Sequence, residues 1–406
     1  MKILVYSCHF GDPIGIGKFS SETAHWLASQ GHEVRVIAAP PYYPQWRLTA
    51  GRWAARYSVD RTNEFMILRC PIWIPSRPAA FLRILHYAIF ALASLPPLFW
   101  WCLVWRPKVV WIVVPPLMCV PGALIGGFIS RGLIWLHVQD LEVDAAFELG
   151  FLRNRILRSL ILGIERFLMA RVHVTSAVSA AMVATLKRKK IRRTPILFQN
   201  WVDTDLIFPM GKSPLREQLS SGASFLALYS GNLGRKQGLE MIIEVAELLR
   251  DRPEVRIVVS GEGVSHQQVA EAAARLPNIS LLPLVPFSEL NWLLNAADVH
   301  LLPQRDEVTD LVMPSKLGGM LASGRPVIAA ARPQTQLAEE IVGAGIVVPP
   351  GDARAMADAI CRLHEQPGLK KELSVGARAR AIAYWSKRRI LCEFENRLQA
   401  EVVRIS

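Results

Sequence analysis

One segment of the chain combines glycines with adjacent cations at a point where a predicted strand gives way to a helix. Residues 231–238 place Gly231 and Asn232 ahead of Arg235 and Lys236. Glycines let a ligand approach the backbone closely, and fixed cations stabilise the negative charge that develops on a departing pyrophosphate. A solvated basic turn is the alternative. We interpret the segment as a phosphate-binding loop.

Glycines recur at two other predicted strand ends. In residues 11–17, Gly15 and Gly17 would let a phosphate reach amide groups at the positive end of the following helix. The segment lacks the G-x-G-x-x-G dinucleotide fingerprint, and a plain tight turn explains it equally well. Residues 260–263 repeat the glycines around Glu262, where the base or ribose of a nucleotide would lie.

A third element of the predicted site begins with Ser315 and Lys316, directly after Pro314. A helix starting at Ser315 would turn its positive N-terminus and the Lys316 ammonium toward a bound anion. An ordinary capped helix explains the same residues.

Acidic and imidazole side chains follow another predicted strand. His137 ends that strand, and Asp140 follows it with Glu142 and Asp144 close behind. Asp140 could activate an acceptor hydroxyl or orient His137. An acidic cluster at a helix N-terminus is the alternative. His9 also ends a strand, where packing and acceptor contact cannot be told apart.

The pair Asp203 and Asp205 has the spacing of a D-x-D metal motif. The pair lies at the start of a stretch rich in proline, serine and glycine, residues 200–222, which we interpret as an interdomain linker. We therefore expect no metal site there. The six cysteines form no C-x-x-C pair, which fits a reducing cytosol better than a disulfide scaffold.

The elements that must position these residues alternate between strand and helix along the whole chain. One series runs to about residue 190, and a second runs from residue 225 to 384. This pattern predicts an α/β protein with two Rossmann-like domains facing across a cleft. We expect one domain over 1–200, a second over 201–385, and a helix over 386–406 that returns to the first domain.

The charge and hydropathy of the chain indicate which kinds of partner it could bind. The chain of 406 residues carries 47 Lys and Arg against 34 Asp and Glu, a net charge of +13, and is 51% hydrophobic, which excludes disorder. Residues 187–193 hold six cations without interleaved aromatics, which argues against nucleic acid. An anionic lipid surface or a polyprenyl diphosphate fits this segment better, and a solvated basic face is the alternative.

Residues 84–105 form an almost uncharged stretch about as long as a membrane span. Pro96 and Pro97 interrupt it, and Arg83 and Arg106 flank it, which favours a buried helix on a parallel sheet. A helix inserted in, or resting on, a membrane is the alternative. Upstream of the basic segment, residues 152–170 predict an amphipathic helix that carries further arginines.

The order of these segments resembles that of the retaining glycosyltransferases of family 4, which have the two-domain GT-B architecture. Within that family the chain is most similar to the colanic acid biosynthesis glycosyltransferases, a group described as fucosyltransferases. The resemblance covers nearly the whole chain. It implies that 1–200 is the acceptor-side domain and that 201–385 is the nucleotide-sugar-binding domain. It is carried by residues 15–19, 39–44, 136–144, 199–203, 231–234 and 314–317.

The resemblance implies roles for particular residues. His137 matches the family's active-site histidine, which contacts the transferred sugar, and Arg235 with Lys236 matches the diphosphate-binding pair. Gln237 stands where many relatives have a lysine, so Lys236 is expected to take over that lysine's role. Ser315 and Lys316 match the segment that cradles the nucleotide diphosphate.

One departure from the family concerns the ribose. Most of the family carries two glutamates eight positions apart, and the second holds the ribose hydroxyls. The second position is Gly319 here, and the first falls near Leu311. We expect Glu307, Asp310 or backbone groups to make the ribose contact instead.

The sequence and its resemblance together predict a glycosyltransferase of exopolysaccharide biosynthesis that needs neither a metal nor a cofactor. We expect transfer with retention from a nucleotide-diphosphate sugar, with GDP-fucose favoured, to a polyprenyl-diphosphate-linked oligosaccharide. The predicted location is the cytoplasmic side, peripheral on the inner face of the plasma membrane. The alternatives are a nucleotide-sugar epimerase or phosphorylase of the same architecture, or a non-catalytic protein that binds sugar nucleotides.

Overall fold

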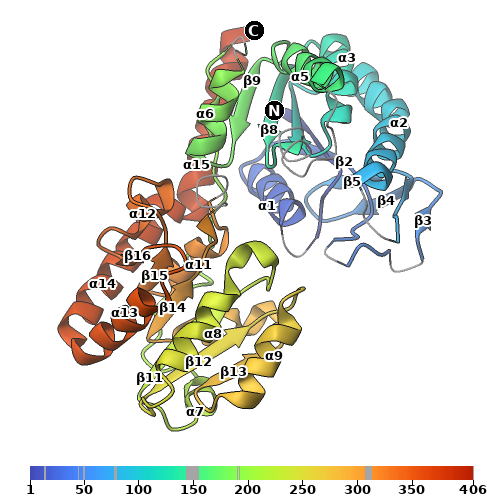
Figure 1. Ribbon diagram of the computed structural model, residues 1–406. Helices are drawn as coiled ribbons and strands as arrows, with labels where there is room; N and C mark the ends of the chain where they lie inside the picture. The colour runs from blue at the N-terminus through green and yellow to red at the C-terminus, as the bar shows by residue number, and fades with distance from the viewer. Residues whose placement is uncertain are drawn as a thin grey trace. The chain divides into compact units, whose positions relative to one another are not determined.

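The computed structural model consists of two compact units (Figure 1). Unit 1 comprises Met1–Gln199 and Leu391–Ser406, and unit 2 comprises Asn200–Ile390. Each unit is described by itself. The structure describes residues 1–12, 15–43, 45–48, 51–76, 80–142, 155–189, 191, 193–306 and 313–405.

Unit 1 is built on an eight-stranded sheet in the order β10-β9-β8-β7-β1-β2-β5-β4. The pairs within this sheet are parallel, except that β4 runs antiparallel to β5. The strands are β1 Lys2–Ser7, β2 Glu33–Ala38, β4 Ser58–Arg61, β5 Met66–Arg69, β7 Val109–Val114, β8 Leu133–Val138, β9 Val174–Ala177 and β10 Ile196–Leu197; a separate antiparallel pair is formed by β3 Trp53–Ala54 and β6 Ile72–Trp73.

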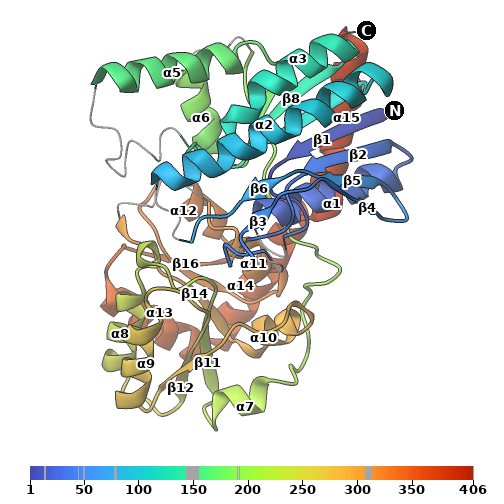
Figure 2. The same cartoon turned by 90° about the vertical axis from the view of Figure 1, so that its right-hand side faces the viewer.

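The helices of unit 1 cover this sheet (Figure 2). They are α1 Ile16–Ser29, α2 Ala80–Val104, α3 Val120–Ser130, α5 Arg155–Met169 and α6 Ala180–Arg188, with a 3₁₀ turn at Leu117–Cys119. Every residue of β7 and β8 is buried. That is why both strands appear in the sequence as continuous apolar runs rather than alternating ones.

The apolar stretch near residues 84–105 forms α2, whose one face packs into the core of unit 1. Phe90, Leu98 and Cys102 are fully buried there, and Gly126 of α3 lies against Leu98 and Cys102. Phe81–Val104 is long and apolar enough to cross a membrane by length and composition alone, although a core helix passes the same test. Leu92, Trp100 and Leu103 of the same helix are exposed.

Unit 2 has a six-stranded parallel sheet in the order β13-β12-β11-β14-β15-β16. The strands are β11 Phe225–Ser230, β12 Val255–Ser260, β13 Ile279–Leu282, β14 Val299–Leu302, β15 Val327–Ala330 and β16 Gly345–Val348; the helices are α7 Arg216–Ser220, α8 Leu239–Leu248, α9 His266–Arg275, α10 Leu290–Ala296, α11 Lys316–Ala322, α12 Gln336–Ile341, α13 Ala353–Glu365 and α14 Pro367–Arg380. Two apolar clusters pack on the sheet of unit 2 and form its core.

The last helix, α15 Lys387–Ile405, begins in unit 2 and continues into unit 1 from Leu391. Within unit 1, Phe394 stacks on Phe198 with a centroid distance of 4.3 Å. Glu395 accepts hydrogen bonds from Trp26 and pairs with His32 at 3.0 Å. These contacts fix the end of the chain against the N-terminal sheet.

Candidate functional site

The loops after β11 and β12 of unit 2 lie against each other, backbone to backbone. The amide of Gly231 donates to the carbonyl of Ser260 at 2.9 Å, and the amide of Leu233 donates to the carbonyl of Glu262 at 2.8 Å. A Cβ atom at Gly261 would lie 1.9 Å from the Gly231 carbonyl oxygen. Only glycine fits at position 261, so this close approach of the two loops requires that glycine.

Lys316, the first residue of α11, extends its side chain over this loop. Its ammonium Nζ lies 3.0 Å from Oε1 of Gln237 and 3.9 Å from the ring centroid of Tyr229. A Cβ at Gly231 would lie 3.6 Å from the same nitrogen. Burial lowers the pKa of Lys316 to about 7. Within the described part of the chain, the Lys316 ammonium contacts an amide and an aromatic ring, neither of which neutralises a cation.

Tyr229, in β11, supports the glycine loop that follows this strand. Its ring is fully buried, and its hydroxyl donates to the carbonyl oxygen of Asn232 at 2.7 Å. Burial raises the pKa of Tyr229 well above its ordinary value. The tyrosine therefore stays neutral and serves as a fixed support for both the loop and the Lys316 ammonium.

Other predicted donor-binding residues of unit 2 belong to the same loops or to the start of α11. Arg235 and Lys236 belong to a 3₁₀ turn, Arg235–Gln237, and Lys236 is exposed. Glu262 is exposed after β12, and Ser315 is exposed at the start of α11 without a capping hydrogen bond from its hydroxyl. The side chain of Arg235, and Glu307 and Asp310 as a whole, lie outside the described residues.

Gly319 lies on α11, three residues after Lys316. A Cβ atom there would have Leu294 Cδ1 at 3.5 Å as its nearest neighbour, which is ordinary van der Waals contact. A side chain at position 319 is therefore not excluded by packing against its surroundings.

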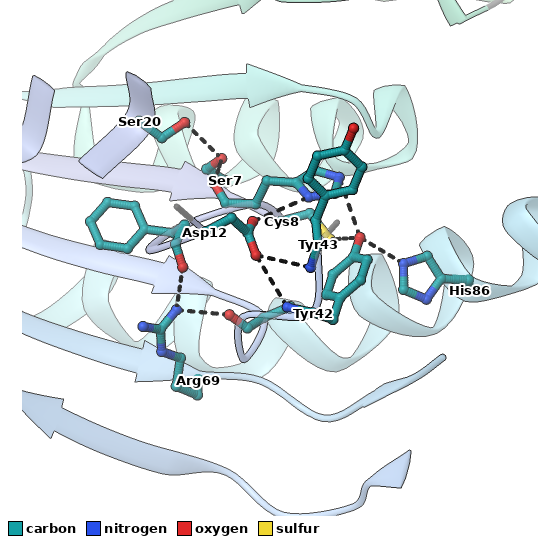
Figure 3. A network of polar contacts seen from close by, with 11 residues as sticks. Ser7, Cys8, Asp12, Ser20, Tyr42, Tyr43, Arg69 and His86 are labelled. Atoms are coloured by element: carbon teal, nitrogen blue, oxygen red, sulfur yellow. Dashed lines mark hydrogen bonds and ion pairs between the residues drawn. The ribbon is translucent and has the colours of Figure 1, made fainter. Parts of the chain in front are cut away.

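In unit 1, the side-chain carboxylate of Asp12 lies in the turn before α1 (Figure 3). Oδ1 of Asp12 accepts hydrogen bonds from the amides of Tyr42 and Tyr43, both at 3.1 Å. A Cβ at Gly17 would lie 2.4 Å from Oδ2 of Asp12. A phosphate approaching Gly15 and Gly17 would meet this negative charge in the place where the helix N-terminus offers its amides.

The same network continues through two histidines beneath the loop. The Tyr42 hydroxyl lies 2.9 Å from Nε2 of His86 and 3.3 Å from Nε2 of His9. Nδ1 of His86 is 2.6 Å from the carbonyl oxygen of Trp73 and so donates to it. Burial lowers the pKa of His86 to about 4. This buried chain of polar groups joins the ends of β1, β2 and β6.

His137, at the end of β8, is buried in unit 1. Its Nδ1 lies 2.9 Å from Oγ of Ser176, and its Nε2 lies 3.0 Å from Nε2 of Gln139. Its ring stacks on Trp111 with a centroid distance of 5.9 Å. Burial lowers the pKa of His137 to about 3, so the imidazole is neutral at physiological pH.

Two carboxylates follow His137 in different environments. Asp140 is exposed, whereas Glu142 is half-buried and accepts a hydrogen bond from the amide of Leu117 at 2.8 Å. Burial raises the pKa of Glu142 to about 7, and the charge of Asp140 adds to that rise. Glu142 is thus the carboxyl group in this loop that changes protonation near neutral pH. Asp144 lies outside the described residues.

Asp203 has a structural role. Its Oδ1 accepts hydrogen bonds from the amides of Asp205 and Leu206, and its Oδ2 pairs with Lys387 at 3.2 Å. These bonds close a turn and tie it to the start of α15, which accounts for the aspartate without a metal.

Comparisons with known proteins agree with this architecture. Residues 15–201 match the family model of the glycosyl transferase 4-like domain, and residues 224–366 match that of the glycosyl transferases group 1. The chain is 35% identical to the putative colanic acid biosynthesis glycosyl transferase WcaI of Escherichia coli (strain K12), over 98% of this chain and 99% of the relative. It is 26% identical to the probable glycosyltransferase WbjE of Pseudomonas aeruginosa, over 58% of this chain and 61% of the relative.

Solved structures share the fold. Sucrose-phosphate synthase from Thermosynechococcus elongatus matches with a TM-score of 0.74 at 16% identity, over 100% of both chains. Anabaena HepE, solved in complex with UDP and glucose, matches with a TM-score of 0.69 at 16% identity, over 98% of this chain and 100% of the other. The chain therefore belongs to the glycosyltransferases of the family 4 type, and its two Rossmann-like units form the GT-B fold.

Proposed function

We propose that this glycosyltransferase moves a sugar from a nucleotide-diphosphate donor to a polyprenyl-diphosphate-linked oligosaccharide, with retention and without a metal, in exopolysaccharide biosynthesis of the colanic acid type. The 35% identity to WcaI over nearly the whole chain supports the colanic acid assignment. GDP-fucose is the favoured donor because of the resemblance to the group of fucosyltransferases. The site of action would be the inner face of the plasma membrane, where the lipid-linked acceptor is available.

The observation that carries the donor assignment is the position of Lys316 over the glycine loop of unit 2. A cation with a pKa lowered by burial gains most when a phosphate arrives beside it, because the phosphate restores its charged form. The lysine lies directly against the loop, because a Cβ at Gly231 would meet Lys316 Cδ at 3.3 Å. We assign the diphosphate to the glycine loop and Lys316, with Lys236 and Ser315 as further contacts, and we keep Arg235, Asn232, Glu262 and Asp310 as donor-binding residues on the strength of the sequence prediction.

Catalysis by this arrangement would rest on stabilising the leaving group. As the bond from the sugar to the diphosphate breaks, negative charge accumulates on the phosphate oxygens, and cations fixed in advance lower the barrier. We place the transferred sugar near His137, as the family resemblance implies, and the acceptor hydroxyl near Asp140. Glu142 is a further candidate for the proton acceptor, because its pKa lies close to neutral pH.

A donor and acceptor screen tests the proposal. The purified chain is incubated with GDP-sugars and UDP-sugars and with a polyprenyl-diphosphate-linked oligosaccharide, with and without a chelator, and the anomeric configuration of the product is read by NMR. A glycolipid product of retained configuration that survives chelation supports the proposal. An altered sugar nucleotide would identify an epimerase instead, and nucleotide binding without any product would identify a non-catalytic protein.

Lys236 provides an internal check on the assignment of the phosphate loop. Because its side chain is exposed, Lys236→Ala should reduce turnover by ~10-fold or more while leaving the melting temperature unchanged. Lys371→Ala, at an exposed lysine of α14 in the same unit, is the matched control. An unchanged rate in Lys236→Ala removes Lys236 from the mechanism.

A further inference from the structure

Helix α5 of unit 1 presents apolar side chains to solvent along one side. Ile156, Leu160, Ile164 and Phe167 are 80%, 59%, 49% and 54% exposed, and their spacing of four, four and three residues places them in one row. Leu168 and Met169 of the same helix are buried against unit 1. The helix is held to the fold by one side while the row of apolar residues faces outward.

The exposed row continues onto α3. Pro121 of α3 lines the same surface groove as Leu160 and Phe167, and α5 lies beside α3 in both views (Figures 1 and 2). Ile125 and Phe128 follow Pro121 at helical spacing and are 52% and 85% exposed. We call Ile156, Leu160, Ile164, Phe167, Ile125 and Phe128 the apolar face.

Among the described residues of the helices that carry and flank the apolar face, the exposed charges have one sign. The four helices α2, α3, α5 and α6 contain a single carboxylate, Glu165, and that residue is buried and paired with Lys189 at 2.6 Å. The exposed charged residues on and next to α5 and α6 are cations: Arg158, Arg166, Arg171, Lys187 and Arg188. Among the described residues of these helices, the exposed charges beside the apolar face are cations, which favours a partner that is apolar within and negative at its boundary.

This combination distinguishes between possible partners. A second copy of the chain would bring two rims of cations together, and like charges placed opposite each other oppose association. A zwitterionic or anionic bilayer would bury the apolar side chains, but only anionic headgroups would also meet the cations. Apolar surface of this kind on a soluble chain usually marks an interaction site.

We propose that the apolar face docks unit 1 onto a lipid bilayer containing anionic lipid, with α5 lying in the plane of the interface. Ile156, Leu160 and Phe167 enter the boundary between headgroups and acyl chains, and Arg158 and Arg166 contact the headgroup phosphates. This docking deepens the proposed function, because it holds the enzyme on the membrane that would carry its lipid-linked acceptor.

Vesicle sedimentation with the purified full chain tests the docking. Vesicles of phosphatidylcholine alone are compared with vesicles containing a third phosphatidylglycerol, at 50 mM and 500 mM salt. The expected result is at least ~10-fold stronger partitioning to the anionic vesicles at low salt, reduced at high salt because the cations are screened. Equal partitioning to both kinds of vesicle, or none to either, overturns the proposal.

A pair of variants assigns the binding to this face. Leu160→Ser with Phe167→Ser should lower partitioning to anionic vesicles at least ~10-fold, because both side chains are exposed and lose only apolar contact with lipid. Val264→Ser with Val375→Ser, at exposed positions of unit 2, is the matched control and should bind as the wild type does. Equal partitioning of both variants overturns the assignment to α5.

Two further measurements separate this proposal from its alternatives. If the wild type self-associates in solution and Leu160→Ser with Phe167→Ser abolishes that association, the face is an interface between copies and the lipid proposal fails. Calorimetry with GDP and UDP is run on the same samples. Vesicle binding without nucleotide binding would leave the docking proposal intact and refute the proposed function. Nucleotide binding without vesicle binding would refute the docking proposal and leave the proposed function intact.

Discussion

The ammonium of Lys316 donates a hydrogen bond to the side-chain amide oxygen of Gln237 at 3.0 Å, across 79 positions of sequence. This bond joins the start of α11 to the 3₁₀ turn that follows the glycine loop of unit 2. Because Gln237 is uncharged, it orients the lysine without neutralising it. The pair thus positions a cation whose partners among the described residues carry no negative charge.

Nucleotide diphosphates should bind with proton uptake above pH 7. Lys316 has a pKa of about 7 in the free protein, against an ordinary 10.5, and a phosphate beside it raises that pKa. Affinity should therefore be constant below pH 7 and fall as pH rises above it, by at most ~10-fold per unit. Calorimetry at pH 8.5 in buffers of different ionisation enthalpy measures the uptake.

Lys316→Arg is the control for that experiment, because a guanidinium stays protonated throughout this range. The variant should bind the nucleotide with an affinity that does not change between pH 7 and pH 9. A pH dependence equal to that of the wild type would assign the proton to another group.

Replacing Gln237 by glutamate should weaken diphosphate binding. The carboxylate of Gln237→Glu would form an ion pair with Lys316 and raise the pKa of the lysine, and it would also repel the phosphate. We expect ~10-fold weaker binding and loss of the proton uptake at pH 8.5. Gln237→Leu, which removes the hydrogen bond without adding charge, should keep the uptake; equal behaviour of the two variants would contradict this role of Gln237.

The backbone contact between the two glycine loops should be intolerant of a methyl group. Gly261→Ala places a Cβ 1.9 Å from the carbonyl oxygen of Gly231, so we expect a loss of ~2 kcal/mol or more in the free energy of unfolding. Gly319→Ala, whose Cβ meets nothing nearer than 3.5 Å, should change it by less than ~1 kcal/mol. Urea unfolding of both variants checks the difference, and equal effects would show that the loops adapt.

The sequence predicted correctly the elements whose burial shows as a pattern of apolar residues. The fully buried β7 and β8 read as continuous apolar runs. The α/β class and the GT-B fold followed from this alternation and from the family resemblance. The strand β4 was not predicted, because all four of its residues are exposed and only pairing with β5 makes it a strand.

The tertiary contacts that give the site its chemistry could not be predicted from the sequence. Nothing in the spacing of Tyr229, Gln237 and Lys316 shows that they meet, because the contact depends on how α11 packs beside β11. The carboxylate of Asp12 in the turn before α1 is likewise a tertiary feature. For α5, the sequence predicted an amphipathic helix but could not tell that its apolar side faces outward.

Acid should destabilise unit 1 partly through His137. In the folded chain its pKa is lowered to about 3, against 6.5 ordinarily, so the unfolded chain binds the proton more readily between these values. Stability should therefore fall as pH drops from 6.5 toward 3, by up to ~1.4 kcal/mol per unit from this residue. Urea unfolding of His137→Gln between pH 7 and pH 5 should show a shallower fall than the wild type; parallel curves would contradict burial of a neutral ring.

Binding of GDP and UDP to Lys316→Ala tests the central claim, that the loop of unit 2 and this lysine hold the donor's diphosphate. Isothermal calorimetry at pH 7 is run on the wild type, on Lys316→Ala and on the control Lys371→Ala. We predict that Lys316→Ala weakens binding ~100-fold, as loss of one charged contact of about 3 kcal/mol would, while Lys371→Ala binds as the wild type does. Equal dissociation constants for all three proteins would contradict the assignment.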